Sequence, residues 1–244
     1  MRPLTVVVPT YNEVSNLPAL IDSLLKLSLP DLKILIVDDA SPDGTGRLAD
    51  ELAGQLPGTL AVIHRSGKLG LGSAYLKGFQ TALEAGAQAI GQMDADFSHS
   101  PSYLPEFLQR LERTDAVFGS RYVEGGRLDE RWSFGRVFLS KFGNSYARVL
   151  LRLKVRDATG GFRIWRAETL RAFPLDRISS EGYVFQVEMA YLAQRLGFEI
   201  LELPIYFEDR RIGQSKMSLR IQIEAAIRVW LLPFTYRNLR PVRS

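Results

Sequence analysis

Short apolar runs, each followed by a segment with helical periodicity, fill the first half of the chain and constrain its fold more than any other feature. The runs lie at residues 4–13, 32–41, 60–65, 87–96 and 115–122, and the helical segments at 15–27, 43–56, 70–86 and 102–113. A strand that is apolar throughout is typical of a parallel sheet with both faces covered. The alternation therefore predicts an α/β, Rossmann-like fold, with a mostly parallel central sheet and helices on both faces.

The pattern changes after residue 122, where a polar, glycine-bearing stretch predicts a loop. Beyond it the sequence predicts a helix at 134–153, a turn and strand at 157–165, a helix at 183–197 and a strand at 199–208. Residues 218–234 have the spacing of an amphipathic helix. A chain of 244 residues suits one large domain with a tail, so we expect a globular domain over 1–217 and a tail over 218–244.

Charge is distributed unevenly along the chain. Residues 1–118 carry 9 basic and 14 acidic residues, a net charge of −5, whereas residues 119–244 carry 22 and 13, a net charge of +9. The second half should therefore attract phosphates or an anionic membrane surface. No nucleic-acid-binding motif accompanies the charge, so we expect no nucleic-acid partner. The absence of cysteine excludes disulfides and thiolate metal sites, and no apolar run reaches the roughly 18 residues that predict a membrane-spanning helix.

Acidic residues stand at the predicted ends of two strands: Asp38 and Asp39 at the second, Asp94 and Asp96 at the fourth. Ligands bind open α/β sheets at the carboxyl ends of the strands. Residues two apart in a strand share a face, so Asp94 and Asp96 would point the same way. A divalent cation such as Mg²⁺ or Mn²⁺ would relieve their repulsion. A solvated acidic turn is the alternative.

Two glycine-bearing stretches can be interpreted either as ligand-binding segments or as turns and close contacts between elements. After the second strand, we expect Asp39 to take a ligand, while Asp43 and Gly44 make the turn into the next helix. The stretch "GKLGLGSA" at 67–74 is a weak candidate for a phosphate-binding loop, because its spacing fits neither the P-loop nor the dinucleotide-binding pattern. A close approach of the helix to the sheet would explain its glycines equally well. We expect His99 to be structural and Trp132 to serve in packing.

Seven short motifs, taken in order, resemble one known family. They are "PTYNE" (9–13), "VDDASPDGT" (37–45), "MDADFSH" (93–99), "GSRY" (119–122), "DATGGFR" (157–163), "GYVFQVE" (182–188) and "GQSK" (213–216). Together they resemble the polyprenol-phosphate (dolichol-phosphate) mannose synthases, a branch of the family 2 glycosyltransferases with a GT-A fold. The resemblance implies a catalytic domain over 1–217 that transfers a hexose, usually mannose from GDP-mannose, to a polyprenyl or dolichyl phosphate.

The resemblance also implies which residues bind the donor. Those expected to hold the nucleotide are Pro9, Tyr11, Glu13, Val37 and Asp39. Those that match the motif for the metal and the sugar diphosphate are Asp94, Ala95 and Asp96. Ser98 stands where relatives often have Gln, and the third metal ligand would be this serine or a water. The cofactor implied is Mg²⁺ or Mn²⁺. Arg210 and Lys216 match a basic pair that closes over the donor diphosphate, although Lys216 could be an ordinary loop lysine.

The resemblance further implies three residues that contact the acceptor. Arg121, Arg136 and Ser140 match positions that contact the acceptor phosphate, and with Asp96 they form the expected catalytic set; Arg121 is also expected to contact the donor. A solvated helix start is the alternative for Arg136 and Ser140. A lipid phosphate is already ionised at neutral pH, so it needs positioning by cations rather than a general base. One direct attack would invert the anomeric carbon and give a β-linked product.

Two other functions stay open at this point. One is the same reaction with another donor, such as UDP-glucose. The other is a non-catalytic module that binds nucleotide sugars.

The tail is either an ordinary packing helix or a membrane-interfacial one. Residues 210–244 include eight basic residues and one acid, Glu224, which favours the membrane. We therefore expect an enzyme at the cytoplasmic face of the cell membrane, either peripheral or dependent on a membrane-protein partner.

Overall fold

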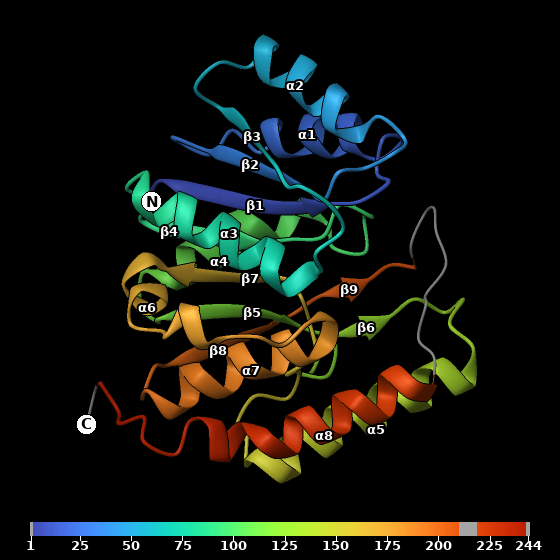
Figure 1. The fold of residues 1–244 in the computed structure, drawn as a ribbon, viewed down its shortest axis with the longest axis vertical. Helices are drawn as coiled ribbons and strands as arrows, with labels where there is room; N and C mark the ends of the chain where they lie inside the picture. The colour runs from blue at the N-terminus through green and yellow to red at the C-terminus, as the bar shows by residue number, and fades with distance from the viewer. Residues whose placement is uncertain (1, 210–218, 243–244) are drawn as a thin grey trace.

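The computed structural model describes residues 2–209 and 219–242, and within them seven strands form one sheet in the order β3-β2-β1-β4-β7-β5-β8 (Figure 1). The strands are β1 (Leu4–Thr10), β2 (Lys33–Asp38), β3 (Leu60–His64), β4 (Ala89–Gln92), β5 (Ala116–Ser120), β7 (Arg163–Arg166) and β8 (Ile200–Pro204). All neighbours pair in parallel except β7, which is antiparallel to both β4 and β5. The predicted α/β fold with a mostly parallel sheet is confirmed.

Helices cover both faces of this sheet. They are α1 (Leu17–Leu25), α2 (Thr45–Gln55), α3 (Leu71–Glu84), α4 (Leu104–Leu111), α5 (Phe134–Leu151), α6 (Ala167–Arg171), α7 (Gly182–Arg195) and α8 (Leu219–Thr235). Helices α3, α6 and α7 contribute to the apolar core on one face, and α1 and α4 to the core on the other. A two-stranded parallel sheet of β6 (Arg127–Leu128) and β9 (Tyr206–Phe207) lies beside the main one (Figure 1).

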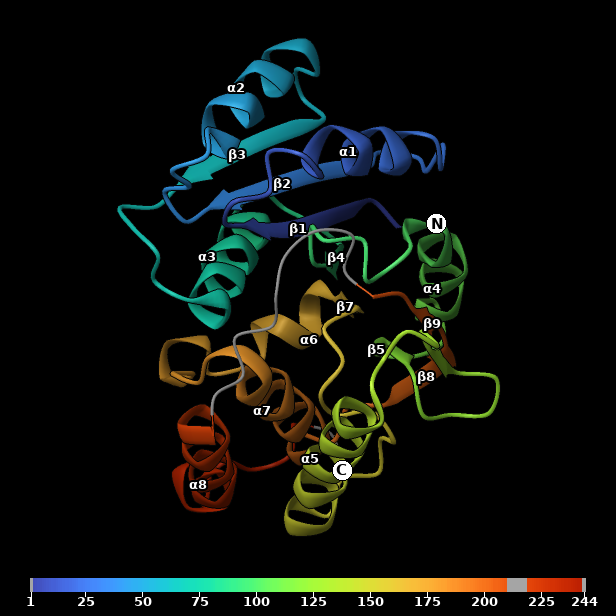
Figure 2. The same cartoon turned by 90° about the vertical axis from the view of Figure 1, so that its right-hand side faces the viewer.

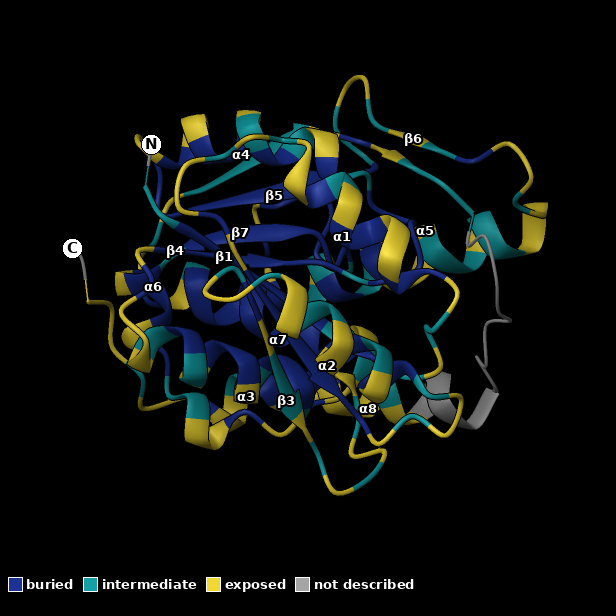
Figure 3. Cartoon of the chain, turned by 90° about the horizontal axis from the view of Figure 1, so that it is seen from above, coloured by how far each residue is buried: buried dark blue, intermediate teal, exposed yellow. Residues whose placement is uncertain are grey.

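The continuous apolar runs exist because each central strand faces two cores. In β1, Val7 belongs to one core while Val6 and Val8 belong to the other, and none of the three is exposed. Figure 3 shows the main sheet buried between helices whose outer faces are exposed. This arrangement directs the loops after β1, β2 and β4 to one edge of the sheet, where parallel strands end together.

The fourth strand is shorter than the sequence predicts. It ends at Gln92, and one further backbone bond, from Met93 N to Val7 O (3.3 Å), prolongs the pairing. The chain then turns, with Phe97 in the left-handed region (φ 61°). Asp94 and Asp96 therefore lie in a loop, so the expectation that strand alternation places them on one face is wrong.

The C-terminal helix packs on the rest of the protein. Val229, Leu232 and Tyr236 are buried, and the Tyr236 hydroxyl donates to Glu188 Oε1 of α7 (2.7 Å). Tyr146 of α5 donates to the carbonyl oxygen of Ala226 (3.0 Å). Among the residues described, no helix is both long enough and apolar enough to cross a membrane.

Helix α3 approaches the sheet most closely at Gly78. A Cβ atom there would lie 2.2 Å from Val7 Cγ1 and 3.2 Å from Val37 Cγ2, both in stiff, buried side chains. We expect Gly78→Ala to lower stability by about 1–3 kcal/mol, seen as a fall in Tm of roughly 2–4 °C per kcal/mol.

Gly54 of α2 is the matched control, because a Cβ atom added there would have no neighbour within 4 Å. Gly54→Ala should leave Tm unchanged or raise it, since alanine restricts the unfolded chain. Equal Tm values for the two variants would contradict the packing at Gly78.

Candidate active site

The residues expected to hold a nucleotide gather at the carboxyl ends of β1 and β2. Pro9 and Val37 are register partners in the parallel pair. Tyr11 follows β1, and its ring lies under the Lys68 ammonium, 3.9 Å from the ring centroid. Glu13 Oε2 accepts a hydrogen bond from Asn16 Nδ2 (2.8 Å). Val37 is fully buried.

Asp38 and Asp39 have different surroundings. Asp38 accepts hydrogen bonds from Thr10 Oγ1 (3.0 Å) and Ser41 N (3.0 Å), which fastens the ends of β1 and β2. Asp39 pairs with Arg65, whose side chain is 9% exposed and which the sequence patterns did not single out. Asp39 Oδ2 also accepts from Leu69 N (3.1 Å) and Gly70 N (3.2 Å). The carboxylate predicted to bind the nucleotide therefore also holds the 67–74 loop.

The turn after β2 is built as expected. Asp43 Oδ1 accepts from Thr45 N (3.0 Å), and Gly44, at φ 89°, directly precedes α2.

The amide groups of the 67–74 loop bind the protein's own carboxylates. Glu181, just before α7, accepts from Gly72 N (2.7 Å) and Ser73 N (3.2 Å). A Cβ on Gly70 would lie 2.3 Å from Glu181 Oε2, and one on Gly72 would lie 2.3 Å from the carbonyl oxygen of Ser180. These two glycines thus allow approach to residues 180–181, rather than the approach to the sheet that was the alternative interpretation. The donors that a phosphate loop would offer are already used by Asp39 and Glu181.

The loop after β4 offers oxygen ligands. Asp94 Oδ1 accepts from the Tyr75 hydroxyl (2.8 Å), and Asp96 Oδ1 accepts from Ser98 N (3.0 Å). Burial, together with the nearby Asp94 carboxylate, raises the pKa of Tyr75, so its hydroxyl stays protonated and donates. Ser98 Oγ is buried and has no hydrogen-bond partner among the described residues. Ala95 lies between the acids and is buried.

This donor set fits a hard divalent cation. Mg²⁺ and Mn²⁺ prefer oxygen ligands, and Mg²⁺ is commonly bound by one or two carboxylates plus substrate phosphates. Asp94, Asp96 and the unpartnered hydroxyl of Ser98 are such a partial set. The described residues contain no cluster of three or more His, Cys, Asp or Glu that could hold a metal by itself. A cation here would therefore complete its shell with substrate or water.

His99 links the acidic loop, through Phe207, to Arg121. It is buried, stacks on Phe162 (5.2 Å between centroids) and meets the edge of Phe207 (5.2 Å). Burial lowers the pKa of His99, outweighing the opposite effect of Asp94 and Asp96. The imidazole is therefore neutral at pH 7, in keeping with the expected structural role.

Arg121 is a buried cation fixed by a carboxylate. Its Nε and Nη2 donate to the two oxygens of Asp157 (2.7 and 2.8 Å), and Nη2 also donates to Thr159 Oγ1 (2.7 Å). Burial alone would lower the pKa of Arg121, but the Asp157 carboxylate outweighs that effect and raises it. The guanidinium therefore stays charged, and it lies 5.2 Å from the ring centroids of both Tyr122 and Phe207.

Arg136 and Ser140 lie one turn apart on α5, as expected. Arg136 Nη1 donates to Asp209 Oδ1 (2.7 Å), and its guanidinium lies over the Trp132 ring, 3.7 Å from the centroid. Ser140 Oγ hydrogen-bonds the Tyr122 hydroxyl (2.7 Å). Trp132 is thus a platform for a cation and not merely a packing residue.

Aromatic residues join the predicted acceptor residues into one region. Tyr122 contacts both Arg121 and Ser140, and Phe207 contacts both Arg121 and Trp132. A cavity of about 570 Å³ opens here, lined in part by Arg121, Trp132 and Lys141. Phe207 has no local sequence signal, because it reaches the site through the pairing of β6 with β9. The remaining predicted pair, Arg210 and Lys216, lies outside the described residues.

Comparison with known proteins identifies the family. The profile of glycosyl transferase family 2 matches residues 5–173, well over half of the chain. The chain belongs to this family. This glycosyltransferase is 46% identical over 242 residues to the undecaprenyl-phosphate mannosyltransferase of Micrococcus luteus, covering 98% of each chain. It is 45% identical over 214 residues to the polyprenol monophosphomannose synthase of Mycolicibacterium smegmatis, covering 87% of this chain and 80% of the relative. The predicted resemblance to polyprenol-phosphate mannose synthases is confirmed.

Solved structures show the same fold. Mannosyl-3-phosphoglycerate synthase from Rubrobacter xylanophilus superposes with a TM-score of 0.71 at 17% identity, covering 100% of this glycosyltransferase and 77% of that chain. Glucosyl-3-phosphoglycerate synthase from Mycobacterium tuberculosis, in complex with Mn²⁺, UDP-glucose and phosphoglyceric acid, gives 0.65 at 19% identity, covering 94% and 79%. The predicted GT-A fold is confirmed.

Removing Asp157 should expose how much the glycosyltransferase depends on the buried pair. Asp157→Ala leaves the Arg121 guanidinium buried without its carboxylate, so we expect a loss of about 3–5 kcal/mol in the free energy of unfolding, measured with denaturant at pH 7. The Arg121 charge lowers the pKa of Asp157 despite burial, which alone would raise it. The pair's contribution is therefore complete above the ordinary pKa of 3.8, and the difference from the wild type should shrink as pH falls below it.

The control is an exposed pair, Asp22 with Lys26, whose side chains are 60% and 73% exposed. Asp22→Ala should change stability by less than about 1 kcal/mol. If both substitutions cost the same, the Arg121–Asp157 pair does not hold the site together.

Proposed function

We propose that this glycosyltransferase transfers mannose from GDP-mannose to a polyprenyl monophosphate and inverts the anomeric carbon, giving a β-linked lipid-phosphate mannose. The observation that carries the proposal is the pairing of a fixed cation with an acidic loop in one site. Arg121 is held charged by Asp157 and lies 5.2 Å from the centroid of the Phe207 ring. The same ring contacts His99 of the acidic loop (5.2 Å between centroids). The names of the two relatives, a polyprenol and an undecaprenyl-phosphate mannose enzyme, support the acceptor class and the sugar.

On the donor side, Pro9, Tyr11, Glu13, Val37 and Asp39 would surround the nucleotide at the ends of β1 and β2. Asp94, Asp96 and Ser98 would hold Mg²⁺ or Mn²⁺. A bound divalent cation would neutralise the charge that develops on the departing diphosphate. Arg210 and Lys216 would add positive charge to the same leaving group.

On the acceptor side, Arg121, Arg136 and Ser140 would position the lipid phosphate. An arginine guanidinium matches a phosphate with two parallel hydrogen bonds, which fixes direction as well as distance. The phosphate is an anion at neutral pH and attacks without losing a proton. The neutral, buried His99 is therefore not required as a base.

Incubation with GDP-mannose, Mg²⁺ or Mn²⁺ and a polyprenyl phosphate should yield a mannosylated lipid phosphate, detected by mass spectrometry. Asp96→Ala should reduce the rate by at least roughly a hundredfold, because the cation that neutralises the charge on the departing diphosphate is lost. Asp22 is an exposed acid of α1 outside the predicted site, so Asp22→Ala should leave the rate unchanged. Full activity of Asp96→Ala would refute the metal assignment.

The alternatives separate in the same assay. If UDP-glucose outcompetes GDP-mannose for the donor site, the proposed donor and sugar are wrong, but the type of reaction stands. Tight donor binding without turnover, for every common nucleotide sugar, would favour a non-catalytic binding module.

Ser98 should contribute to metal affinity. Ser98→Ala is expected to weaken Mn²⁺ binding in the presence of GDP by roughly tenfold, measured directly by electron paramagnetic resonance. Ser100 is a close control, since its hydroxyl bonds Ser102 and not the acidic motif. Ser100→Ala should leave Mn²⁺ affinity unchanged, and identical affinities for the wild type and both variants would remove Ser98 from the site.

We also propose that the enzyme works at the cytoplasmic face of the cell membrane, with the tail 218–244 as a membrane-interfacial element. A polyprenyl chain stays in the bilayer, so the enzyme must meet its acceptor there. The basic excess of residues 210–244 supports attraction to anionic lipid headgroups. A membrane-protein partner would be an additional means of attachment.

A further inference from the structure

The imidazole of His99 is buried beside the acidic loop, and neither of its nitrogens has a hydrogen-bond partner among the described residues. Phe162 stacks on the ring at an interplanar angle of 14°, and Phe207 meets it at 72°. Packing explains the contacts with these two rings, but an apolar ring would pack there equally well. A buried polar group normally has a partner, because leaving it without one lowers stability. The two nitrogens therefore indicate a group that is supplied by a ligand.

Three polar groups from different parts of the chain meet beside Gly161. A Cβ atom on this glycine would lie 3.5 Å from His99 Cε1, 3.5 Å from Asp94 Oδ2 and 3.4 Å from Gln186 Nε2. Cε1 is bonded to both ring nitrogens, so the edge of the imidazole that carries them faces this point. Asp94 Oδ1 accepts from the Tyr75 hydroxyl, and Oδ2 is the oxygen on the Gly161 side. Because glycine has no side chain, a ligand group can approach the backbone here.

A chain of buried hydrogen bonds fixes the amide of Gln186. Trp165 Nε1, which can only donate, donates to Gln92 Oε1 (3.4 Å), and Gln92 Nε2 donates to Gln186 Oε1 (2.6 Å). The oxygen of Gln186 is therefore used within the core, and its Nε2 is the group presented to the point beside the glycine. Arg163 fastens the same region, since it donates to the main-chain oxygens of Gln186 (2.8 Å) and Ala158 (2.9 Å).

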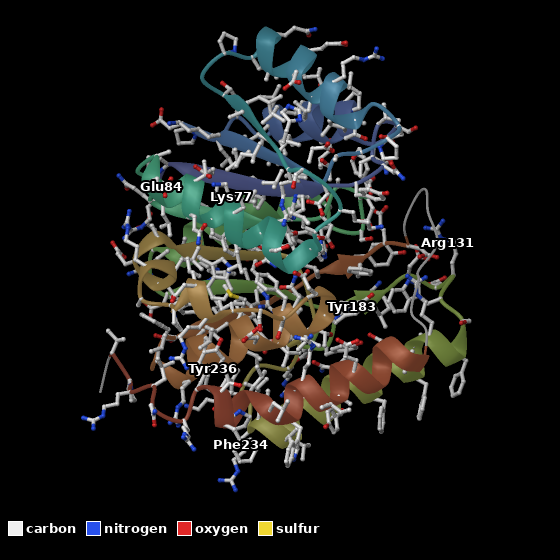
Figure 4. The ribbon with its side chains drawn as sticks, in the orientation of Figure 1. Lys77, Glu84, Arg131, Tyr183, Phe234 and Tyr236 are labelled. Carbon is white, nitrogen blue, oxygen red and sulfur yellow. The ribbon has the colours of Figure 1, made fainter. Side chains whose placement is uncertain are left out.

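The elements that carry these groups lie in the middle of the molecule. Figure 2 shows β4, β7 and α7 near one another there. Figure 4 labels Tyr183 at the start of α7, where its side chain is 46% exposed, whereas Gln186, three residues further along, is 3% exposed. Asp94 is half-buried, while His99 and Gly161 are buried. A ligand would therefore reach this point from the side of the predicted metal ligands.

We propose that His99, Gly161 and Gln186 form, together with Asp94, a subsite for one hydroxyl group of the donor hexose. A hydroxyl has one hydrogen to donate and two lone pairs that accept. It can donate to Asp94 Oδ2 and accept from the Gln186 amide and the imidazole, which satisfies all three groups at once. The carboxylate disfavours an anion at this point. An apolar group would leave the nitrogens unpaired.

The subsite makes His99 and Gln186 specificity-determining residues. Hexoses differ in the direction of their hydroxyl groups. A buried site that hydrogen-bonds one hydroxyl rejects a sugar that lacks it there, because the site's own polar groups are then left unpaired. The inference rests on the proposed function for the presence of a donor hexose, but not for the base of the nucleotide.

Donor binding tests the subsite in two variants that should keep the fold. His99→Phe retains a ring between Phe162 and Phe207 but removes both nitrogens. Gly161→Ala adds a methyl group at ordinary contact distances, at a φ outside the left-handed region. With Mn²⁺ present, both variants should bind GDP like the wild type and GDP-mannose roughly tenfold more weakly or worse, measured by titration calorimetry. Gly54→Ala, whose added Cβ has no neighbour within 4 Å, should bind both ligands like the wild type.

The comparison of the two ligands separates a binding role from a structural one. A histidine that serves only in packing predicts equal loss of affinity for GDP and GDP-mannose, together with a lower Tm, or no loss at all. Either result in His99→Phe would overturn the subsite. Selective loss of GDP-mannose affinity, with circular dichroism and Tm intact, would support it.

Deoxy sugars identify the hydroxyl group. Among GDP-mannose analogues that lack the hydroxyl at C2, C3, C4 or C6, one should bind the wild type roughly tenfold more weakly than GDP-mannose itself. For that analogue the loss should be smaller in His99→Phe, where one of the three partners is already missing. If each analogue loses the same factor in the wild type and in the variant, His99 contacts no hydroxyl and the subsite is refuted.

The same measurements separate this inference from the proposed function. If the wild type binds UDP-glucose in place of GDP-mannose, the proposed donor is wrong, but both subsite variants should still weaken UDP-glucose and not UDP. A wild type that binds GDP-mannose through the subsite and transfers nothing to polyprenyl phosphate would refute only the proposed function. Mannose transfer at the wild-type rate by both variants, with unchanged KM for GDP-mannose, would refute only the subsite.

Discussion

One carboxylate, Asp157, fixes the position of Arg121, the buried cation of the proposed acceptor site. Its loop is fastened from two directions: Glu202 of β8 accepts from Asp157 N (2.8 Å), and Asn144 of α5 accepts from Ala158 N (2.9 Å). The carboxylate then binds Arg121 through the side chain and through the main-chain amide (3.0 Å). A buried guanidinium without a partner would be strongly unfavourable, so the fold can place Arg121 here only with this loop closed. The strand, the helix and the loop are thus fixed together.

The two arginines of the site are held differently, and the difference suits a bound anion. Arg121 is nearly buried and tied at Nε and Nη2, so it offers its remaining donors from a fixed position. Arg136 pairs with Asp209 at side-chain exposures of 34% and 28%, where water competes for the charges. Partly exposed ion pairs contribute little to stability, so a phosphate could replace Asp209 at small cost. An acceptor phosphate bound as proposed would meet one rigid cation that sets its direction and one exchangeable cation that adapts to it.

Local patterns predicted the elements but not the pairings between distant residues. The strands were predictable because β1 and β2 are buried on both faces, and α5 because its apolar spacing is helical. The antiparallel direction of β7 follows from its position between β4 and β5, which no local pattern encodes. Likewise, Glu181 holds Gly72 across 109 residues. Asp94 and Asp96 were found as acids near a strand end, yet their loop conformation depends on a left-handed Phe97, a residue type that gives no warning of such a turn.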